Sequence, residues 1–242
     1  MLKAPEALDA GGRARMCNLA LALPLLAQGV PFLHAGDDLL RSKSLDRDSY
    51  NSGDWFNAID WTGTDNGFGR GLPPGSKNEF LWHLCRPLLA ASPSLAPTPE
   101  LIRFAADHCA ALLRVRYSSP LLRLRTAAQV SAQMAFRNTG PSQAPGVIVF
   151  ELASDDALPA GAAAPGLAHD PAHRRLLVVV NARPDVAHEQ AYPPGCGTLA
   201  LHPALAALAG ADPSGLGACA AADGARVVRV PGRTVCVFVE HR

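Results

Sequence analysis

Apolar residues recur at helical spacing in two stretches of the first half of the chain. In the first stretch, from about residue 8 to residue 28, they are Leu8, Met16, Leu19, Leu23 and Leu26. In the second they are Leu101, Ala105, Cys109, Leu112 and Leu113. Each set falls on one face of an α-helix. Gly29 is a natural stop for the first helix, and Thr98 followed by Pro99 predicts the start of the second.

A short apolar run, Val30–Leu33, separates the first helix from a polar cluster at residues 34–38. The run is compatible with a buried β-strand, and it leads directly into acidic residues. Ligand sites of α/β barrels gather at the carboxyl ends of such strands. We therefore expect Val30–Leu33 to be a strand of an α/β architecture.

Residues 39–97 show no regular periodicity and are rich in Gly, Pro, Asn, Asp and aromatic residues. All three tryptophans of the chain lie here, at Trp55, Trp61 and Trp82. Long irregular connections are uncommon in compact domains and usually carry function. The second predicted helix should follow this segment and end near residues 117–120.

Beyond Pro120 the pattern changes to short strands and turns. The predicted strands are residues 130–137, 146–152, 176–181, 227–230 and 235–239, with the last two forming a closing pair around Pro231-Gly232. Residues 155–173 form an Ala/Gly/Pro-rich stretch that we interpret as a surface loop. The boundary between an α/β part and an all-β part therefore falls near residue 118.

Composition narrows the possible partners. The 22 basic and 21 acidic residues give a formal charge of +1, which provides no electrostatic attraction for nucleic acid or an anionic membrane. The longest apolar stretch, Leu19–Leu26, is interrupted by Pro24 and is too short to cross a bilayer. No secretory signal is visible. We expect no nucleic-acid partner and no membrane partner.

The six cysteines form neither a CxxC motif nor a Cys–His spacing typical of zinc sites. We interpret them as unpaired structural thiols in a reducing compartment, with a disulfide framework or a metal site as the alternative. Neither a metal nor a cofactor is predicted.

The segment Leu40–Asn57 carries the densest group of candidate functional residues. Arginine, aspartate and asparagine side chains hold sugar hydroxyls, and aromatic rings lie against sugar faces. The segment combines both kinds, including Arg47, Asp48, Asp54 and Trp55. The alternative is a surface loop that satisfies its own polar groups, with Arg47 paired to Asp46 or Asp48.

A second cluster, His34 with Asp37 and Asp38, allows a metal or acid–base interpretation. Because neighbouring side chains of an extended segment point to opposite faces, structural hydrogen bonding is the stronger hypothesis. We interpret the remaining histidines as solvated or helix-capping residues.

The chain resembles the pullulanase-type starch debranching enzymes, and most closely the limit dextrinases of plants and algae. The resemblance is carried above all by residues 29–57, which include the run Arg41-Ser-Lys-Ser-Leu-Asp-Arg-Asp-Ser-Tyr-Asn-Ser-Gly-Asp-Trp-Phe-Asn57. It continues through residues 71–74, 77–79, 116–124, 136–142 and 145–149, and with gaps to residues 234–240.

The resemblance implies an α-amylase-type glycoside hydrolase whose catalytic domain is a (β/α)8 barrel. On that pattern, residues 1–117 are the C-terminal end of the barrel, with Val30–Leu33 as its eighth strand. Residues 118–242 are then an antiparallel β-sandwich. The fold class expected is thus α/β plus all-β.

The resemblance also bears on the chemistry. Retaining glycoside hydrolysis requires two carboxyl groups about 5 Å apart. The family's aspartate nucleophile, glutamate acid and His-Asp-Asn aspartate match no residue of this chain, so we expect them upstream. Asp38 stands where the family usually has glutamate. The resemblance implies substrate contact for Arg47 and, less directly, for Asp48, Asp54 and Trp55.

The resulting hypothesis is the C-terminal portion of an enzyme that hydrolyses α-1,6 branch linkages of glucans in a plastid. Its expected partners are starch, limit dextrins and pullulan, and the isolated chain is expected to be inactive. The alternative is a non-catalytic glucan-binding or interaction fragment that works beside other chains.

Overall fold

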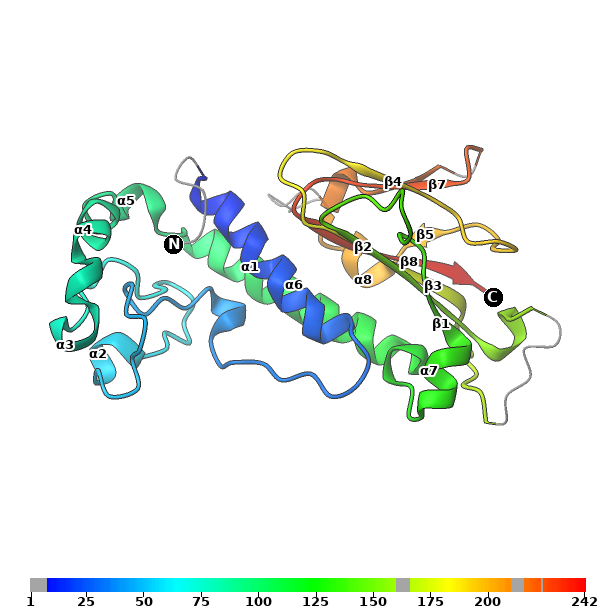
Figure 1. Ribbon diagram of the computed structural model, residues 1–242, viewed down its shortest axis with the longest axis horizontal. Helices are drawn as coiled ribbons and strands as arrows, with labels where there is room; N and C mark the ends of the chain where they lie inside the picture. Colours follow the sequence, from blue (N-terminus) through cyan, green and yellow to red (C-terminus); the bar gives the residue numbers. More distant parts are fainter. Residues whose placement is uncertain (1–7, 160–165, 210–215, 223) are drawn as a thin grey trace. The chain divides into compact units, whose positions relative to one another are not determined.

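The computed structural model describes residues 8–159, 166–209, 216–222 and 224–242. Figure 1 traces these residues as helices joined to antiparallel sheets. They divide into two compact units: unit 1 comprises residues 1–18 and 33–107, and unit 2 comprises residues 19–32 and 108–242. The predicted boundary near residue 118 stays a prediction. Among the described residues, no helix combines the length and the apolar character that crossing a bilayer requires.

The two predicted helices are confirmed. α1 spans Ala10–Leu26, and the side chain of Asp9 accepts a hydrogen bond of 2.7 Å from the Gly12 amide in its first turn. α6 spans Pro99–Ser118, and the Thr98 hydroxyl accepts from the Leu101 amide at 3.3 Å. A side-chain oxygen at a helix start satisfies an amide that has no partner within the helix.

The predicted strand at Val30–Leu33 is wrong. These residues are irregular, and the side chains of Val30 and Phe32 are each 94% exposed. A strand exists only through hydrogen bonds to a neighbouring strand, and none of the described residues pairs with this run. Apolar, β-competent residues without such a partner stay extended but unpaired.

The described residues of unit 1 are otherwise irregular, as expected for residues 39–97, and besides parts of α1 and α6 they contain only short helical segments. These are η1 (Asp37–Leu39), α2 (Asp54–Asn57), α3 (Gly75–Asn78), η2 (Glu79–Leu81), α4 (Trp82–Ala90) and α5 (Ser92–Leu95). Side-chain hydrogen bonds, rather than long helices, therefore shape this part of the chain.

Unit 2 is built around a five-stranded antiparallel sheet with the order β1-β2-β3-β8-β5. Its strands are β1 (Met134–Phe136), β2 (Val147–Ala153), β3 (His173–Asn181), β5 (Ala200–Leu201) and β8 (Thr234–His241). A three-stranded sheet has the order β4-β7-β6, with β4 (His188–Ala191), β6 (Ala220–Ala222) and β7 (Val227–Val230). The other helical segments in the described part of unit 2, besides its parts of α1 and α6, are η3 (Pro120–Arg123), α7 (Ala127–Gln133), η4 (Asp155–Ala157), α8 (Pro203–Ala206) and η6 (Leu216–Ala218).

Four of the strand predictions, at residues 146–152, 176–181, 227–230 and 235–239, are confirmed by β2, β3, β7 and β8. The prediction for residues 130–137 is correct only at Met134–Phe136, because α7 occupies the first part and the strand ends before Arg137. The cause is a local capping box: Thr126 accepts from the Gln129 amide, and the Gln129 side chain accepts from the Thr126 amide. The predicted loop at residues 155–173 begins with η4, and its residues 160–165 lie outside the described part of the chain.

The predicted closing pair at the C-terminus is also wrong. β7 and β8 both exist, but β7 pairs with β4 and β6 whereas β8 pairs with β3 and β5. Asn181 connects the two sheets by donating to the carbonyl oxygens of Val230 and Pro231, each at 3.0 Å. Gly232 follows, and a Cβ there would lie 2.5 Å from the Pro184 carbonyl oxygen. The chain therefore crosses between sheets at this turn.

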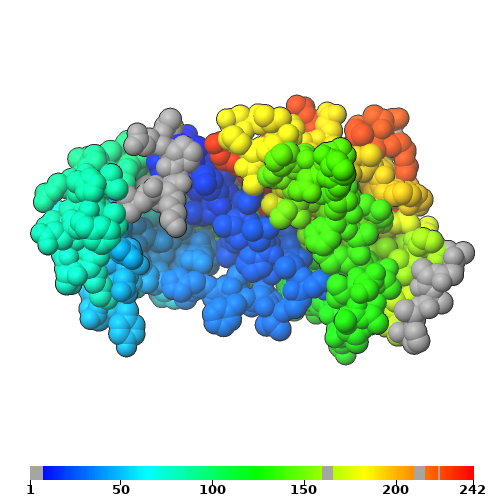
Figure 2. Space-filling model, in the orientation of Figure 1, coloured from blue at the N-terminus to red at the C-terminus, as the bar shows by residue number. Residues whose placement is uncertain are grey.

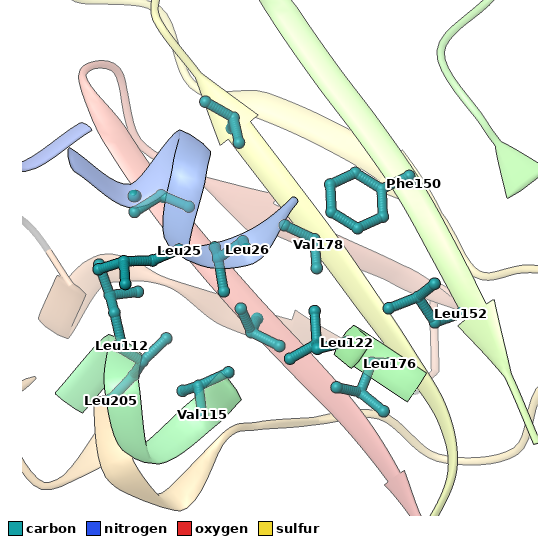
Figure 3. Close-up of a cluster of buried hydrophobic side chains, with 14 of the residues drawn as sticks. Leu25, Leu26, Leu112, Val115, Leu122, Phe150, Leu152, Leu176, Val178 and Leu205 are labelled. Carbon is teal, nitrogen blue, oxygen red and sulfur yellow. The ribbon is translucent and has the colours of Figure 1, made fainter. Parts of the chain in front are cut away.

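The core of unit 2 has one layer on each face of the five-stranded sheet. In β3, Leu176 and Val178 belong to one buried cluster, whereas Leu177 and Val179 belong to the other. This alternation follows from the two-residue repeat of a strand. Valines of β7 complete the second cluster, and Figure 3 shows leucines of α1, α6 and α8 gathered in the first.

The cysteine prediction is wrong for one pair. Cys219 and Cys236 form a disulfide, while Cys17, Cys85, Cys109 and Cys196 are free thiols. Cys236 lies in β8 on the face that the smaller sheet covers, and Cys219 directly precedes β6 of that sheet. Packing of the smaller sheet against the five-stranded sheet therefore brings the two thiols together, and the spacing of the cysteines alone could not indicate it.

Four of the histidines interpreted as solvated or capping residues are buried: His108, His173, His188 and His202. His202 is 5% exposed, its Nε2 lies 3.0 Å from the Ser118 hydroxyl, and its Nδ1 accepts from the Ala204 amide at 3.1 Å, which caps α8. The ring of His173 lies 5.9 Å from that of His202 and 5.5 Å from that of His241. Burial first, and then the charges of His173 and His241, lower the pKa of His202 to about 4.

This shift predicts a loss of stability in weak acid. Unfolded His202 takes up a proton at about pH 6.5, whereas the folded protein resists protonation until about pH 4. The free energy of unfolding is therefore unaffected by protonation of His202 above about pH 6.5, and it decreases as the pH falls towards about 4. We expect His202→Asn, which keeps an acceptor at the start of α8, to remove about 3 kcal/mol of this pH dependence. Urea unfolding of both proteins across this range measures it.

A parallel pH dependence of both proteins would contradict the assignment to His202. The buried Asp170 changes the stability in a different pH range, so its titration can be told apart from that of His202. Burial raises its pKa, but hydrogen bonds, first from His173 and Ser119, outweigh burial and lower the pKa to about 2. Its contribution is lost only below the ordinary aspartate range, at lower pH than that of His202.

Candidate substrate-binding segment

The segment 40–57 lies within unit 1 and is closed by two polar side chains. Arg41 donates to the Asn57 carbonyl oxygen at 3.1 Å and to His34 Nε2 at 3.0 Å. The side-chain amide of Asn57 donates through Nδ2 to the carbonyl oxygens of Ser49 at 2.8 Å and Gly53 at 3.0 Å. Its Oδ1 accepts from the Ser49 hydroxyl at 2.8 Å. These bonds join the two ends of the segment and fix its loop.

His34 belongs to this hydrogen-bond network. Its Nδ1 lies 3.3 Å from an Asp37 carboxylate oxygen, and Arg41 occupies its other ring nitrogen. These are contacts of the kind that the structural interpretation of the cluster expects for His34 and Asp37, and that interpretation stays a prediction. In the described part of the chain, the residues close enough together to share a metal ion are instead Asp155, Asp156 and His169. These are exposed, and Arg242 already donates to Asp156.

The backbone at Arg47 is held by Asn78, which is fully buried. Asn78 accepts from the Arg47 amide at 3.2 Å and donates to an Asp46 carboxylate oxygen and to the Pro74 carbonyl oxygen, both at 3.0 Å. Burial by itself would raise the pKa of Asp46. Hydrogen bonds to its carboxylate outweigh burial and lower this pKa; they come from Ser52, the Asp48 amide and Asn78. Asp46 is thus an ionised acceptor that anchors the loop.

The side chains of Arg47 and Asp48 are exposed and have separate partners. The guanidinium carbon of Arg47 lies 5.3 Å from the centre of the Phe80 ring. Lys77 Nζ lies 3.2 Å from an Asp48 carboxylate oxygen and donates to the Asp48 carbonyl oxygen at 3.1 Å. Among the described ion pairs, Arg47 thus has no carboxylate partner, and the alternative pairing with Asp46 or Asp48 is not found.

Asp54 and Trp55 open α2 on the other side of the loop. The Trp55 indole N–H donates to the Arg70 carbonyl oxygen at 2.8 Å, and the Arg70 guanidinium lies 5.8 Å from the indole ring. Arg70 also pairs with Asp65 at 3.0 Å. Trp55 nevertheless stays 64% exposed, and Asp54 is exposed at the first turn of the helix. Figure 2 shows the cyan side chains around α2 at the molecular surface.

A tight turn supports this second group. Asp60 accepts from the hydroxyls and amides of Thr62 and Thr64 and from the Asp65 amide, and these bonds, first that of the Thr62 hydroxyl, hold its pKa well below the usual range. Gly67 then approaches the start of the loop at positive φ, where a Cβ would lie 2.8 Å from the Ser42 carbonyl oxygen. Only glycine fits there without strain.

These contacts place the four predicted site residues in one unit but in two groups. Arg47 and Asp48 contact residues 77–80, whereas Trp55 contacts residue 70. No described hydrogen bond or ion pair joins the groups. The exposed guanidinium donates hydrogen bonds, the exposed carboxylates of Asp48 and Asp54 accept them, and the indole offers an apolar face. This is binding chemistry for a polyhydroxylated ligand.

Comparison with known proteins places the chain. A family model described as "Alpha-1,6-glucosidases, pullulanase-type, C-terminal" matches residues 63–241. The chain belongs to the pullulanase-type α-1,6-glucosidases. It is 41% identical over its whole length to the chloroplastic Pullulanase 1 of Arabidopsis thaliana, and 36% identical over 76% of its length to a pullulanase of Klebsiella pneumoniae.

A solved pullulanase has the same fold. The crystal structure of the maltotriose complex of PulA from Klebsiella pneumoniae matches 99% of this chain with a TM-score of 0.84 and 29% identity. The chain spans 24% of the length of the Arabidopsis pullulanase and 24% of that PulA chain. It therefore corresponds to the C-terminal part of a pullulanase-type enzyme.

Sequence reasoning missed the residues that hold the loop of this pullulanase-type chain. Asn78, Phe80 and Arg70 contact the candidate residues, yet none was assigned a role. The run Lys77–Glu79 did contribute to the family resemblance, which was the available signal. Its role was hidden because these side chains meet the segment 40–57 only through the fold.

Proposed function

We propose that this chain is the C-terminal part of a hydrolase that cleaves α-1,6-glucosidic branch linkages. The family match supports the reaction class. The observation that carries a substrate-binding role is the Arg47 side chain, which is exposed, held by its backbone to a buried asparagine, and without a carboxylate partner among the described residues. The guanidinium is thus positioned and available.

Within this proposal, Arg47 donates hydrogen bonds to glucose hydroxyls, and Asp48 and Asp54 accept them. Trp55 offers its exposed indole face to a sugar ring. The Lys77 ion pair with Asp48 and the Arg70 hydrogen bond with Trp55 support these roles because they restrict the two side chains before substrate arrives. Preorganisation lowers the entropy cost of binding.

We further propose that residues 1–117 form the C-terminal end of a (β/α)8 barrel and residues 118–242 the β-sandwich that follows. The mixture of helices with two antiparallel sheets supports the second part. The unpaired, largely exposed run at residues 30–33 fits the first, because a barrel strand can pair only where a neighbouring barrel strand is present.

Branched α-glucans such as starch, limit dextrins and pullulan are the proposed substrates of the complete enzyme. The Klebsiella PulA structure is a complex with maltotriose, and this ligand supports the same substrate class. The chloroplastic Arabidopsis relative supports a plastid location. Fluorescence imaging of the tagged natural protein in its own cells tests the location.

The isolated chain is expected to release no reducing ends from pullulan. The reason is that the family's catalytic carboxylates match no residue of this chain, and hydrolysis at a glycosidic bond requires such a pair. The measurement is a reducing-end assay on the purified 242-residue protein, with the complete enzyme, meaning the protein that carries these residues together with the catalytic carboxylates, as positive control.

Two outcomes would contradict parts of this proposal. Turnover of pullulan by the isolated chain above that of its Asp48→Ala, Asp54→Ala variant would show that the chain holds its own catalytic groups. A complete enzyme that cleaves only α-1,4 linkages, identified from its products, would contradict the assigned reaction.

A further inference from the structure

Arg47 and Phe80 form an exposed contact in unit 1 that no hydrogen bond explains. The guanidinium carbon lies 5.3 Å from the ring centre, within the range of a cation–π interaction. Phe80 is nevertheless 60% exposed, and it belongs to neither buried cluster. A large aromatic side chain in this position contributes little to the core, so its contact with Arg47 is its main described interaction.

A buried side chain ties the Arg47 backbone to the segment that carries Phe80. Asn78 accepts a hydrogen bond from the Arg47 amide, and it is the last residue of α3, directly before the η2 segment that carries Phe80. Movement of one backbone relative to the other would break this part-buried hydrogen bond and leave the buried Asn78 oxygen without the Arg47 amide, which is costly. The backbone contact therefore keeps the Arg47 guanidinium and the Phe80 ring close to one another.

The two carboxylates next to Arg47 in the sequence, Asp46 and Asp48, already have other partners. Asp46 accepts from Asn78 and from the Asp48 amide, and the Asp48 carboxylate pairs with Lys77. A carboxylate partner would occupy the N–H edge of the guanidinium, whereas an aromatic ring contacts its face and leaves the N–H groups at the edge free to donate. Support from a ring thus keeps the hydrogen-bonding edge available.

We propose that Phe80 is a positioning residue that orients the Arg47 guanidinium for hydrogen bonding to a glucan hydroxyl. The inference rests on the proposed function, because it assumes that Arg47 contacts substrate. Phe80 acts through Arg47, and its ring face is covered by the guanidinium rather than by sugar.

Steady-state kinetics of the complete enzyme on pullulan tests this with four proteins besides wild type: Phe80→Leu, Phe80→Tyr, Arg47→Ala and the double variant Arg47→Ala, Phe80→Leu. Phe80→Leu removes the aromatic face at an exposed position and should raise KM roughly two- to fivefold, the range for an exposed cation–π contact. kcat should stay unchanged. Phe80→Tyr keeps the face and should restore the wild-type KM.

The double variant distinguishes positioning from direct contact. If Phe80 acts through Arg47, removing the ring has no further effect once Arg47 is alanine. An equal rise in KM in both backgrounds would show that Phe80 contacts glucan itself, and an unchanged KM for Phe80→Leu would show that the ring has no role. Either result overturns the inference.

Failure of the proposed function has a different signature. Kinetics of Arg47→Ala equal to wild type would remove Arg47 from the substrate site, whatever Phe80→Leu does. Thermal unfolding of each variant checks folding, and Phe80→Met, which also lacks a π-face, replaces Phe80→Leu if the latter lowers the Tm. If Phe80 had only a structural role, Phe80→Leu would lower the Tm, and the KM would not follow the presence or absence of the aromatic face. A wild-type KM in Phe80→Tyr is the result that a purely structural role does not predict.

Discussion

Leu176→Ala should lower the free energy of unfolding of unit 2 by about 2–5 kcal/mol, the range for truncation of a fully buried leucine. Leu176 lies in β3 at the middle of the five-stranded sheet, between Leu152 of β2 and Val239 of β8, and has no exposed surface. Removing its isobutyl group leaves a cavity that the paired strands on both sides cannot fill. Urea unfolding followed by circular dichroism measures the change.

Ile148→Ala is the matched control. Ile148 lies in β2 of the same sheet, but its side chain is 42% exposed. A similar aliphatic truncation there removes less buried surface and should cost about 1 kcal/mol or less. Equal losses for the two variants would mean that the packing in Figure 3 does not describe the core in solution.

Arg47→Ala in the complete enzyme should lower kcat/KM on pullulan by the equivalent of about 1–3 kcal/mol, roughly 5- to 150-fold. The physical reason is the loss of a charge-assisted hydrogen bond to substrate from a guanidinium whose backbone is fixed by a buried asparagine. Steady-state kinetics with pullulan, together with the Tm of each protein, measure the effect. The truncation should change stability little, because Arg47 is exposed.

Arg103→Ala is the control for this experiment. Arg103 is an exposed arginine of α6 whose partner is Glu100 at 3.2 Å, one turn away. Such surface pairs contribute little, so both kinetics and stability should stay close to wild type. Unchanged kinetics for Arg47→Ala, together with a lowered Tm, would support the structural alternative for this loop.

Local sequence signals sufficed where the interactions are local. The side chain of Thr98 and the ring of Pro99 act within one helical turn, so the start of α6 could be predicted, and the apolar run at residues 176–181 does become a strand. Family membership was also available from the sequence, because the run from Arg41 to Asn57 is long and specific. The polar composition of that run indicated a binding segment.

The sequence could not give the partners of these elements. β7 and β8 follow one another closely but enter different sheets, and Val30–Leu33 has strand character without a strand beside it. Pairing depends on which distant segment is present to supply hydrogen bonds. The pattern of one segment does not contain that information.

Charged residues within apolar strands show the same limit. Glu151, Arg175 and Glu240 interrupt three β-strands, and alone each would be costly to bury. In the structure, Arg175 pairs with Glu151 at 3.0 Å and with Glu240 at 2.8 Å, so the charges compensate one another across the sheet. The strand register decides this, because it places Arg175 opposite Glu240 and diagonal to Glu151, two residues along the neighbouring strand.

By itself, the sequence determined the family, the two long helices and most of the strands, and it marked residues 40–57 as the segment with binding chemistry. Only the tertiary structure decided that Arg47 contacts the Phe80 ring rather than pairing with Asp46 or Asp48. It also decided that Asn78, which directly precedes the segment carrying Phe80, holds the Arg47 backbone. The physical reason is range. Caps and strand periodicity act within a few residues, whereas ion pairs, ring contacts and sheet neighbours depend on which distant residues the fold brings within a few ångströms.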